Sequence, residues 1–191
     1  MSGLFARPGA DGAMLLCLDA LSLASDSDAG PPLEIGWSAN AARLLGHARR
    51  EGWAVSHAIS RRPRPGEGPW QALSGLGPEP SEPVYHRDQP SAFGSPELRE
   101  ILRLGAPAEV VLCGVSARGS ALATALDALR MSARLTVAVD ACWLPPAERK
   151  GLEALLQLQR MGLTHCGVRL VATQALMQPW RRLRVVQGGL S

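Results

Sequence analysis

The stretch VVLCGVSARGSALATALDALR, residues 110–130, predicts the fold class of the chain. It opens with an unbroken apolar run, which is typical of a strand buried on both faces of a parallel sheet. A short turn that contains Gly114 follows, and leucines then recur from Leu122 at the helical spacing of i, i+4 and i+7. The pattern predicts a strand, a turn and a helix, with Ser120 at the start of the helix.

The same alternation of strand and helix extends along the chain. Apolar runs predict buried strands at residues 13–19, 53–59, 109–115, 134–141 and 167–173, and a weaker strand at 83–87. Helical patterns fall between them, at residues 38–52, 95–105, 120–131 and 145–162. This order indicates an α/β domain with a mostly parallel sheet and right-handed crossovers. We expect a single domain over residues 1–191, with a long Pro/Gly-rich loop at 61–83 placed to form the rim or lid of a site.

Length and composition narrow the class of protein. The chain has 191 residues, of which 46% are hydrophobic and 19% charged, as in an ordinary globular domain. No run approaches the ~18 apolar residues of a membrane span. The N-terminal region does not have the pattern of a secretory signal, so we expect a cytoplasmic protein without a membrane partner. The net charge is +3, but the arginines are scattered and there are one Tyr and two Phe, so no nucleic-acid partner is expected.

Cysteines and histidines predict neither a disulfide framework nor a metal site. Cys17, Cys113, Cys142 and Cys166 stand apart, mostly in apolar runs, and are interpreted as buried, reduced thiols. The four histidines are far apart in sequence, so no metal is expected, and His57 on its apolar strand is interpreted as a core residue. Nothing matches a dinucleotide or P-loop fingerprint, so no cofactor is expected.

Ligands of parallel α/β sheets bind at the carboxyl ends of the strands. Asp19, Asp140 and residues 114–120 lie at such ends. One candidate there is a hydrolase triad, because Ser116, Asp140 and His165 follow the chain order of the α/β-hydrolases. However, the turn lacks the second Gly of G-x-S-x-G, and His165 precedes its strand instead of following one. The pattern therefore disfavours this triad.

Three segments in the right order resemble the isochorismatase-like hydrolases, the superfamily of isochorismatases, nicotinamidases and related amide hydrolases. The first is LLCLDAL, in which the opening strand ends in an acid, Asp19. The second is VYHRDQPSAFGSPELREIL, which is similar to the family's K-x-x-x-S-A-F-x-x-T-x-L segment. The third is VVLCGVSARGSALATALDAL, which is similar to G-V-x-x-x-x-C-V-x-x-T-A-x-D-A. The resemblance covers residues 13–180.

The resemblance implies a three-layer sandwich with a six-stranded, mostly parallel sheet in the order 3-2-1-4-5-6, commonly assembled as a homo-oligomer. It also implies a mechanism in which an Asp takes a thiol proton, a Lys holds charge beside the pair, and the thiolate attacks an amide or nitrile-like carbon. Carried over position by position, the acid is Asp19, the Lys position holds Arg87 and the Cys position holds Ser120.

The resemblance also implies an oxyanion hole for a small-molecule substrate. The N–H groups of Ser116 and Ser120, near a cis peptide in the G-V-x turn, would hold the oxyanion. The other residues assigned to oxyanion or substrate binding are Val115, Gly119, Phe93 and, as a lid contact in the long loop, Trp70.

The two substitutions argue against covalent hydrolysis. A Ser hydroxyl is far less acidic than a thiol, so a lone carboxylate is a poor base for it. An Arg cannot give up a proton, and its planar fork favours a salt bridge that would make Asp19 a weaker base.

Two hypotheses follow for the function. In the first, a small carboxylate, vinyl-ether or amide substrate is hydrolysed with Asp19 as acid or base and without a thiol nucleophile, and Arg87 is an alternative anchor for a substrate carboxylate. In the second, the chain is a catalytically degenerate family member with a binding or assembly role, and Asp19 and Arg87 form a structural ion pair.

Overall fold

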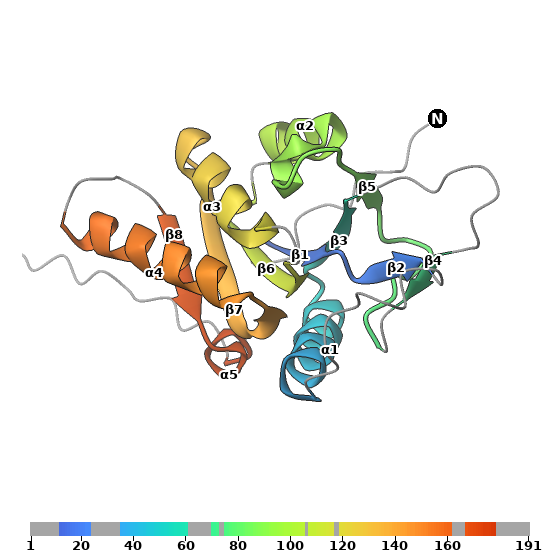
Figure 1. The fold of residues 1–191 in the computed structure, drawn as a ribbon. Coiled ribbons are helices and arrows are strands. Elements are labelled where there is room, and N and C mark those ends of the chain that lie inside the picture. The colour runs from blue at the N-terminus through green and yellow to red at the C-terminus, as the bar shows by residue number, and fades with distance from the viewer. Residues whose placement is uncertain are drawn as a thin grey trace, which may run out of the picture.

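The computed structural model describes residues 12–23, 35–60, 70–72, 75–105, 107–116, 119–161 and 167–178. Its main feature is a six-stranded sheet in which every neighbouring pair of strands is parallel (Figure 1). In the chain order of these six strands, the sheet order is 3-2-1-4-5-6, so the predicted fold class is confirmed. From one edge to the other, the strands are β5 (Val84–His86), β3 (Ala54–Ile59), β1 (Ala13–Leu18), β6 (Glu109–Val115), β7 (Arg134–Trp143) and β8 (Gly167–Val171).

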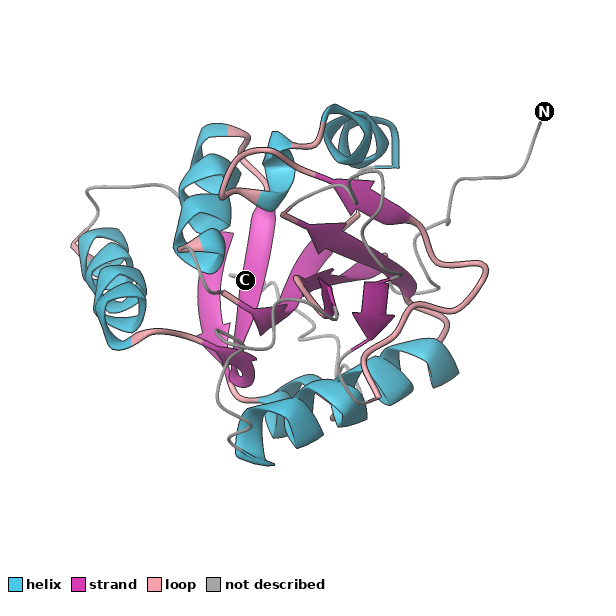
Figure 2. Cartoon of the chain, turned by 45° about the vertical axis from the view of Figure 1, so that its right-hand side comes forward, coloured by secondary structure: helices cyan, strands magenta, loops and turns pink. Residues whose placement is uncertain are grey.

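Helices cover both faces of the sheet and complete the three layers (Figure 2). One face carries α1 (Ile35–Arg50) and the short α5 (Thr173–Leu176). The opposite face carries α2 (Pro96–Gly105), α3 (Ser120–Arg130) and α4 (Pro146–Arg160), and the 3-10 helix η1 (Ala92–Gly94) contacts both α2 and α3. The helices α1, α2, α3 and α4 match the predicted ranges closely, except that α1 begins three residues before the predicted start at Ser38, whereas the short helices η1 and α5 were not predicted.

A second, two-stranded sheet was not predicted. In it, β2 (Leu21–Leu23) pairs antiparallel with β4 (Trp70–Ala72). The β4 strand lies within the stretch 61–83 that we expected to be a loop without regular structure, and this expectation was wrong for those three residues. Three residues are too few for a period-two pattern to be visible in a sequence. Residues 61–69 and 73–74 of the same stretch lie outside the described residues.

The central strands form the core, as their unbroken apolar runs predict. Every residue of β1, β3 and β6 is buried. Cys17, Cys113 and Cys142 lie in these and the neighbouring strand as buried, free thiols, whereas Cys166 lies outside the described residues. Within the part of the chain that the structure describes, no helix has the length and apolar character needed to cross a membrane.

Gly114 brings the end of β6 close to the end of β1. Its φ is +106°, and a Cβ atom there would lie 2.3 Å from the carbonyl oxygen of Leu18. Only a residue without a side chain allows this approach, because L-residues rarely adopt such a φ and the Cβ would overlap the neighbouring backbone. The register between β6 and β7 shifts at the same place. The turn after β6 therefore lies beside Asp19, the first residue after β1.

Candidate active site

Asp19 is held at the carboxyl end of the sheet by contacts to β3. Its own N–H donates to the carbonyl of Ala58 at 2.9 Å, and its Oδ1 accepts the N–H of Ser60 at 2.7 Å. Its φ of 42° lies in the left-handed region, which Asp adopts more readily than most residues. The side chain keeps 15% of its surface exposed. Asp19 is thus fixed at the strand end and still open to solvent.

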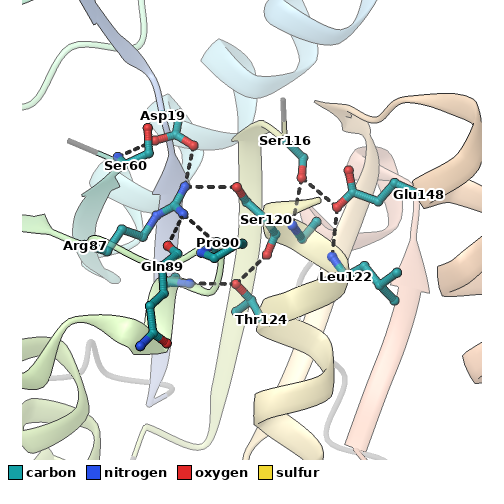
Figure 3. A network of polar contacts seen from close by, with 12 residues as sticks. Asp19, Ser60, Arg87, Gln89, Pro90, Ser116, Ser120, Leu122, Thr124 and Glu148 are labelled. Carbon is teal, nitrogen blue, oxygen red and sulfur yellow. Dashed lines mark hydrogen bonds and ion pairs between the residues drawn. The ribbon is translucent and has the colours of Figure 1, made fainter. Parts of the chain in front are cut away.

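Arg87 follows β5 and reaches across the strand ends to Asp19. The backbone N–H of Arg87 donates to the carbonyl of Ile59 at 3.0 Å. Its side chain is buried, and its Nη2 donates both to Asp19 Oδ2 and, at 3.0 Å, to Ser120 Oγ (Figure 3). Its Nη1 donates to the backbone carbonyls of Gln89, at 2.8 Å, and Pro90. A single guanidinium therefore links the acid, the Ser and the loop after β5.

Ser120 is the first residue of α3 and is fully buried. Its carbonyl accepts the hydroxyl of Thr124 at 2.6 Å, and the Thr124 Oγ1 accepts the N–H of Ala92 at 2.9 Å. These contacts attach η1, which follows the Arg87 loop, to the first turn of α3. The structure thus brings Asp19 and Arg87 together with Ser120, which are the three positions that the resemblance assigned to the site.

The contacts define what this trio can do chemically. The Ser120 hydroxyl oxygen accepts from a guanidinium, and Arg remains protonated in proteins, so Arg87 cannot remove the hydroxyl proton. Among the described residues, no imidazole or carboxylate oxygen is hydrogen-bonded to Ser120 Oγ. A cation and a backbone N–H both stabilise the charged form of Asp19. The arrangement holds Asp19 in its carboxylate form, which can accept a proton but is a weaker base than an unpaired carboxylate, and it disfavours Ser120 as a nucleophile. Arg87, buried with these partners, is not placed to anchor a substrate carboxylate.

The predicted oxyanion donor Ser116 has another role in the structure. Its N–H donates to the carbonyl of Trp143 at 3.0 Å, and the Val115–Ser116 peptide bond is trans. The backbone of β7 therefore takes the donor that we assigned to an oxyanion, and the expected cis peptide is absent from this described turn. The N–H of Ser120 remains available for that role, because the first N–H groups of a helix have no acceptor within the helix.

A carboxylate that the sequence analysis missed lies behind this turn. Glu148, in the first turn of α4, is 6% exposed. The Ser116 hydroxyl donates to Glu148 Oε1 at 2.6 Å, and the N–H of Leu122 donates to the same oxygen at 2.9 Å (Figure 3). An acidic residue in the first turn of a helix is usually solvated, so the sequence contained no signal for this buried contact.

The remaining residues predicted for oxyanion or substrate binding are located in the structure as follows, or lie outside its described residues. Val115 and Phe93 are buried members of the hydrophobic core. Gly119 precedes α3 with a φ of 74°. Trp70 lies in β4, and its side chain is outside the described residues, as are the other lid residues at 61–69. Their assignment to oxyanion or substrate binding stays a prediction.

The disfavoured triad and the predicted core histidine can be located as well. The Asp140 carboxylate accepts the N–H and hydroxyl of Thr173, both at 2.7 Å, and His165 is outside the described residues. His57 is buried, with Nε2 3.0 Å from Glu82 Oε2. Burial lowers the pKa of His57, although Glu82 opposes the shift. The described residues contain no cluster suited to a metal ion.

Comparison with known proteins places this chain in a family. The isochorismatase domain model matches residues 22–173. None of the curated proteins compared with the chain matches it. Similar solved structures include an isochorismatase from Pseudomonas putida, with 23% identity, 88% of this chain and 92% of that chain covered, and a TM-score of 0.64.

Two further solved structures show the same fold. An isochorismatase-like hydrolase from Alkaliphilus metalliredigens has 16% identity, covers 92% of this chain and 97% of its own, and has a TM-score of 0.69. N-carbamoylsarcosine amidase from Thermoplasma acidophilum has 19% identity, covers 84% of this chain and 96% of its own, and has a TM-score of 0.59. Because the family model matches most of its length, this chain belongs to the isochorismatase domain family, the hydrolase family that its motifs resemble.

Proposed function

We propose that the chain hydrolyses a small amide-type substrate by direct attack of water, with Asp19 as the acid/base and without an enzyme nucleophile. The observation that carries this proposal is the position of Arg87 Nη2, which donates to both the Asp19 carboxylate and the Ser120 hydroxyl. This cation keeps Asp19 in the carboxylate form that can accept a proton, although it makes that carboxylate a weaker base, and it gives the Ser120 oxygen a donor in place of a base. The partly exposed Asp19 side chain is open to water.

In the proposed reaction, water adds to the carbonyl carbon of the amide and the amine leaves. Asp19 takes a proton from water while the water oxygen adds to the carbonyl carbon. The carbonyl oxygen becomes an oxyanion, which the N–H of Ser120 at the N-terminal end of α3 stabilises. The tetrahedral intermediate then expels the amine, and Asp19 returns the proton to the leaving nitrogen. One water is consumed, an acid and an amine are released, and the protein is unchanged.

Of the vinyl-ether and amide classes, the amide is favoured by the contacts of Asp19. Hydrolysis of a vinyl ether begins with protonation of the substrate and needs Asp19 in its neutral form. Arg87 and the N–H of Ser60 both oppose that form. A similar fold in an N-carbamoylsarcosine amidase agrees with an amide substrate, and that in an isochorismatase keeps the vinyl ether as a class to be tested.

A binding or assembly role is the second candidate. Arg87 is buried, and its two terminal nitrogens contact Asp19, Ser120 and two backbone carbonyls, as in a structural clamp. In that case the fold would serve to bind a small molecule or a second copy of the chain, with no turnover.

The test is a turnover assay with nicotinamide and simple amides, and with isochorismate-like vinyl ethers. Each class is run with the parent chain, Asp19→Asn and Asp127→Asn, which removes a partly exposed carboxylate of α3 that pairs with Arg130. We expect amide turnover that Asp19→Asn reduces by at least about 100-fold and Asp127→Asn leaves unchanged. Turnover that survives Asp19→Asn contradicts the proposal. No turnover in any class, together with activity gained by Ser120→Cys plus Arg87→Lys, supports the binding or assembly role instead.

A further inference from the structure

The polar contacts behind α3 centre on one buried carboxylate. Glu148 comes from α4, which is separate from the elements that carry Asp19, Arg87 and Ser120. Its Oε1 accepts the hydroxyl of Ser116 and the N–H of Leu122. Its Oε2 is buried and has no hydrogen-bond partner among the described residues. A buried carboxylate with one unpartnered oxygen is costly, so its presence calls for a specific role.

Glu148, directly and through Ser116, provides acceptors for N–H groups in the first turn of α3. The first N–H groups of a helix have no acceptor within the helix. Here the N–H of Ala121 donates to Ser116 Oγ at 2.7 Å, that of Leu122 donates to Glu148, and that of Ala123 closes the first helical turn onto the carbonyl of Gly119 at 2.9 Å. Gly119, which precedes the helix, has no side chain with which to cap it. The cap is instead supplied by Ser116 and Glu148.

We propose that Glu148 is a positioning residue for the candidate site, which holds the first turn of α3 and places a negative charge behind the helix terminus that carries Ser120. The inference rests on the proposed function for its catalytic meaning. Figure 3 shows the arrangement, with Asp19 and Arg87 on one side of Ser120 and Ser116 and Glu148 on the other.

The proposed role has two consequences that oppose each other. By capping Leu122 and, through Ser116, Ala121, Glu148 fixes the direction of the remaining N–H, that of Ser120. The same negative charge offsets part of the positive potential at the helix terminus. An anion at the position of Ser120 is therefore well oriented but less stabilised than at a helix terminus without a carboxylate.

A thiolate at position 120 is a suitable probe of this potential, and it requires no turnover. Ser120→Cys is prepared alone and combined with Glu148→Gln, which keeps an oxygen acceptor but removes the charge. The thiolate is followed by its ultraviolet absorbance between pH 5 and pH 11, with the parent chain subtracted to remove its own cysteines. Glu153→Gln is the matched control, because Glu153 is an exposed carboxylate on the same helix.

We expect Glu148→Gln to lower the pKa of the introduced thiol by about half a unit or more, the size of an interaction between a charge and a helix terminus. Glu153→Gln should leave that pKa unchanged. Equal titrations for the two variants, or a higher pKa with Glu148→Gln, would overturn the proposal.

A second variant keeps the test decisive if Glu148→Gln does not fold. Glu148→Asp retains the charge and shortens its reach, so it should speed hydrogen exchange of the Leu122 amide by at least about tenfold. Unchanged exchange at Leu122 would contradict the capping role. Neither measurement depends on the substrate assay, so a failure of the proposed hydrolysis can be distinguished from a failure of the proposed role of Glu148.

Discussion

Arg87→Lys tests whether the guanidinium fork holds the site together. Lys keeps the positive charge beside Asp19, but its single nitrogen cannot replace two nitrogens that donate in different directions. In the structure, Nη2 donates to Asp19 and Ser120, and Nη1 donates to the carbonyls of Gln89 and Pro90. The most favourable placement of a Lys ammonium keeps the Asp19 contact and leaves the two carbonyls without this donor.

The expected cost follows from those two lost contacts. Gln89 and Pro90 are exposed residues, so water can replace the lost donor, and each lost hydrogen bond costs about 0.5–1.5 kcal/mol; the free energy of unfolding should therefore fall by roughly 1–3 kcal/mol. For a chain of this length, that corresponds to a melting temperature lower by about 2–12 °C. Urea unfolding followed by circular dichroism gives the same quantity from the midpoint and slope.

The matched control is Arg103→Lys on α2. Arg103 contacts Glu100 at 2.7 Å, but both side chains are more than half exposed. Exposed ion pairs contribute little to stability, so this variant should melt at the parent temperature. If Arg87→Lys is as mild as Arg103→Lys, Arg87 is not the structural centre of the site.

Three other predictions concern the core. Burial lowers the pKa of His57 below its usual 6.5, so as the pH falls below about 6.5 the unfolded chain binds a proton that the folded chain does not. The contribution of His57 to stability is therefore present above that pH and is lost below it. His57→Gln should flatten this decline in urea titrations at pH 5 to 8. A slope that His57→Gln leaves unchanged would assign the dependence to another group. Gly114→Ala should cost at least about 4 kcal/mol, whereas Gly52→Ala, with a similarly positive φ of 69° but open space around it, should cost about 1 kcal/mol. Similar unfolding free energies for the two variants would show that the close approach to Leu18 does not set the cost of a side chain at position 114. The hydrogen bond with Cys113 and burial raise the pKa of Cys17, and both thiols are buried. A disulfide reagent at pH 8 should therefore label Cys17 and Cys113 in urea but not in the folded chain. Mass spectrometry of the peptides measures this labelling. Rapid labelling of either thiol in the folded chain would contradict this.

The sequence predicted the sheet because its strands are buried on both faces. The apolar runs of β1 and β6 are continuous, and a turn or capping residue ends each one, so a mostly parallel sheet follows from general rules, whereas the strand order came from the family resemblance. The strands β2 and β4 escaped prediction because their three-residue length carries no period.

The candidate site was predictable where a motif existed and not where a contact depends on tertiary packing. Asp19, Arg87 and Ser120 came from the family motifs, and the structure places them in contact. Ser116 was predicted as an oxyanion donor, but the carbonyl of Trp143 on the neighbouring strand takes its N–H. Glu148 was missed, because the sequence pattern of a Glu in the first turn of a helix is the same whether its side chain faces solvent or caps a neighbouring helix.

The most direct test of the central claim compares Asp19→Asn with Ser120→Ala on an amide that the parent chain hydrolyses. Ser120→Ala removes the hydroxyl but keeps the backbone N–H at the start of α3. We expect Ser120→Ala to retain turnover within about tenfold of the parent and Asp19→Asn to lose at least about 100-fold. Turnover abolished by Ser120→Ala, or retained by Asp19→Asn, would contradict hydrolysis by water with Asp19 as the acid/base.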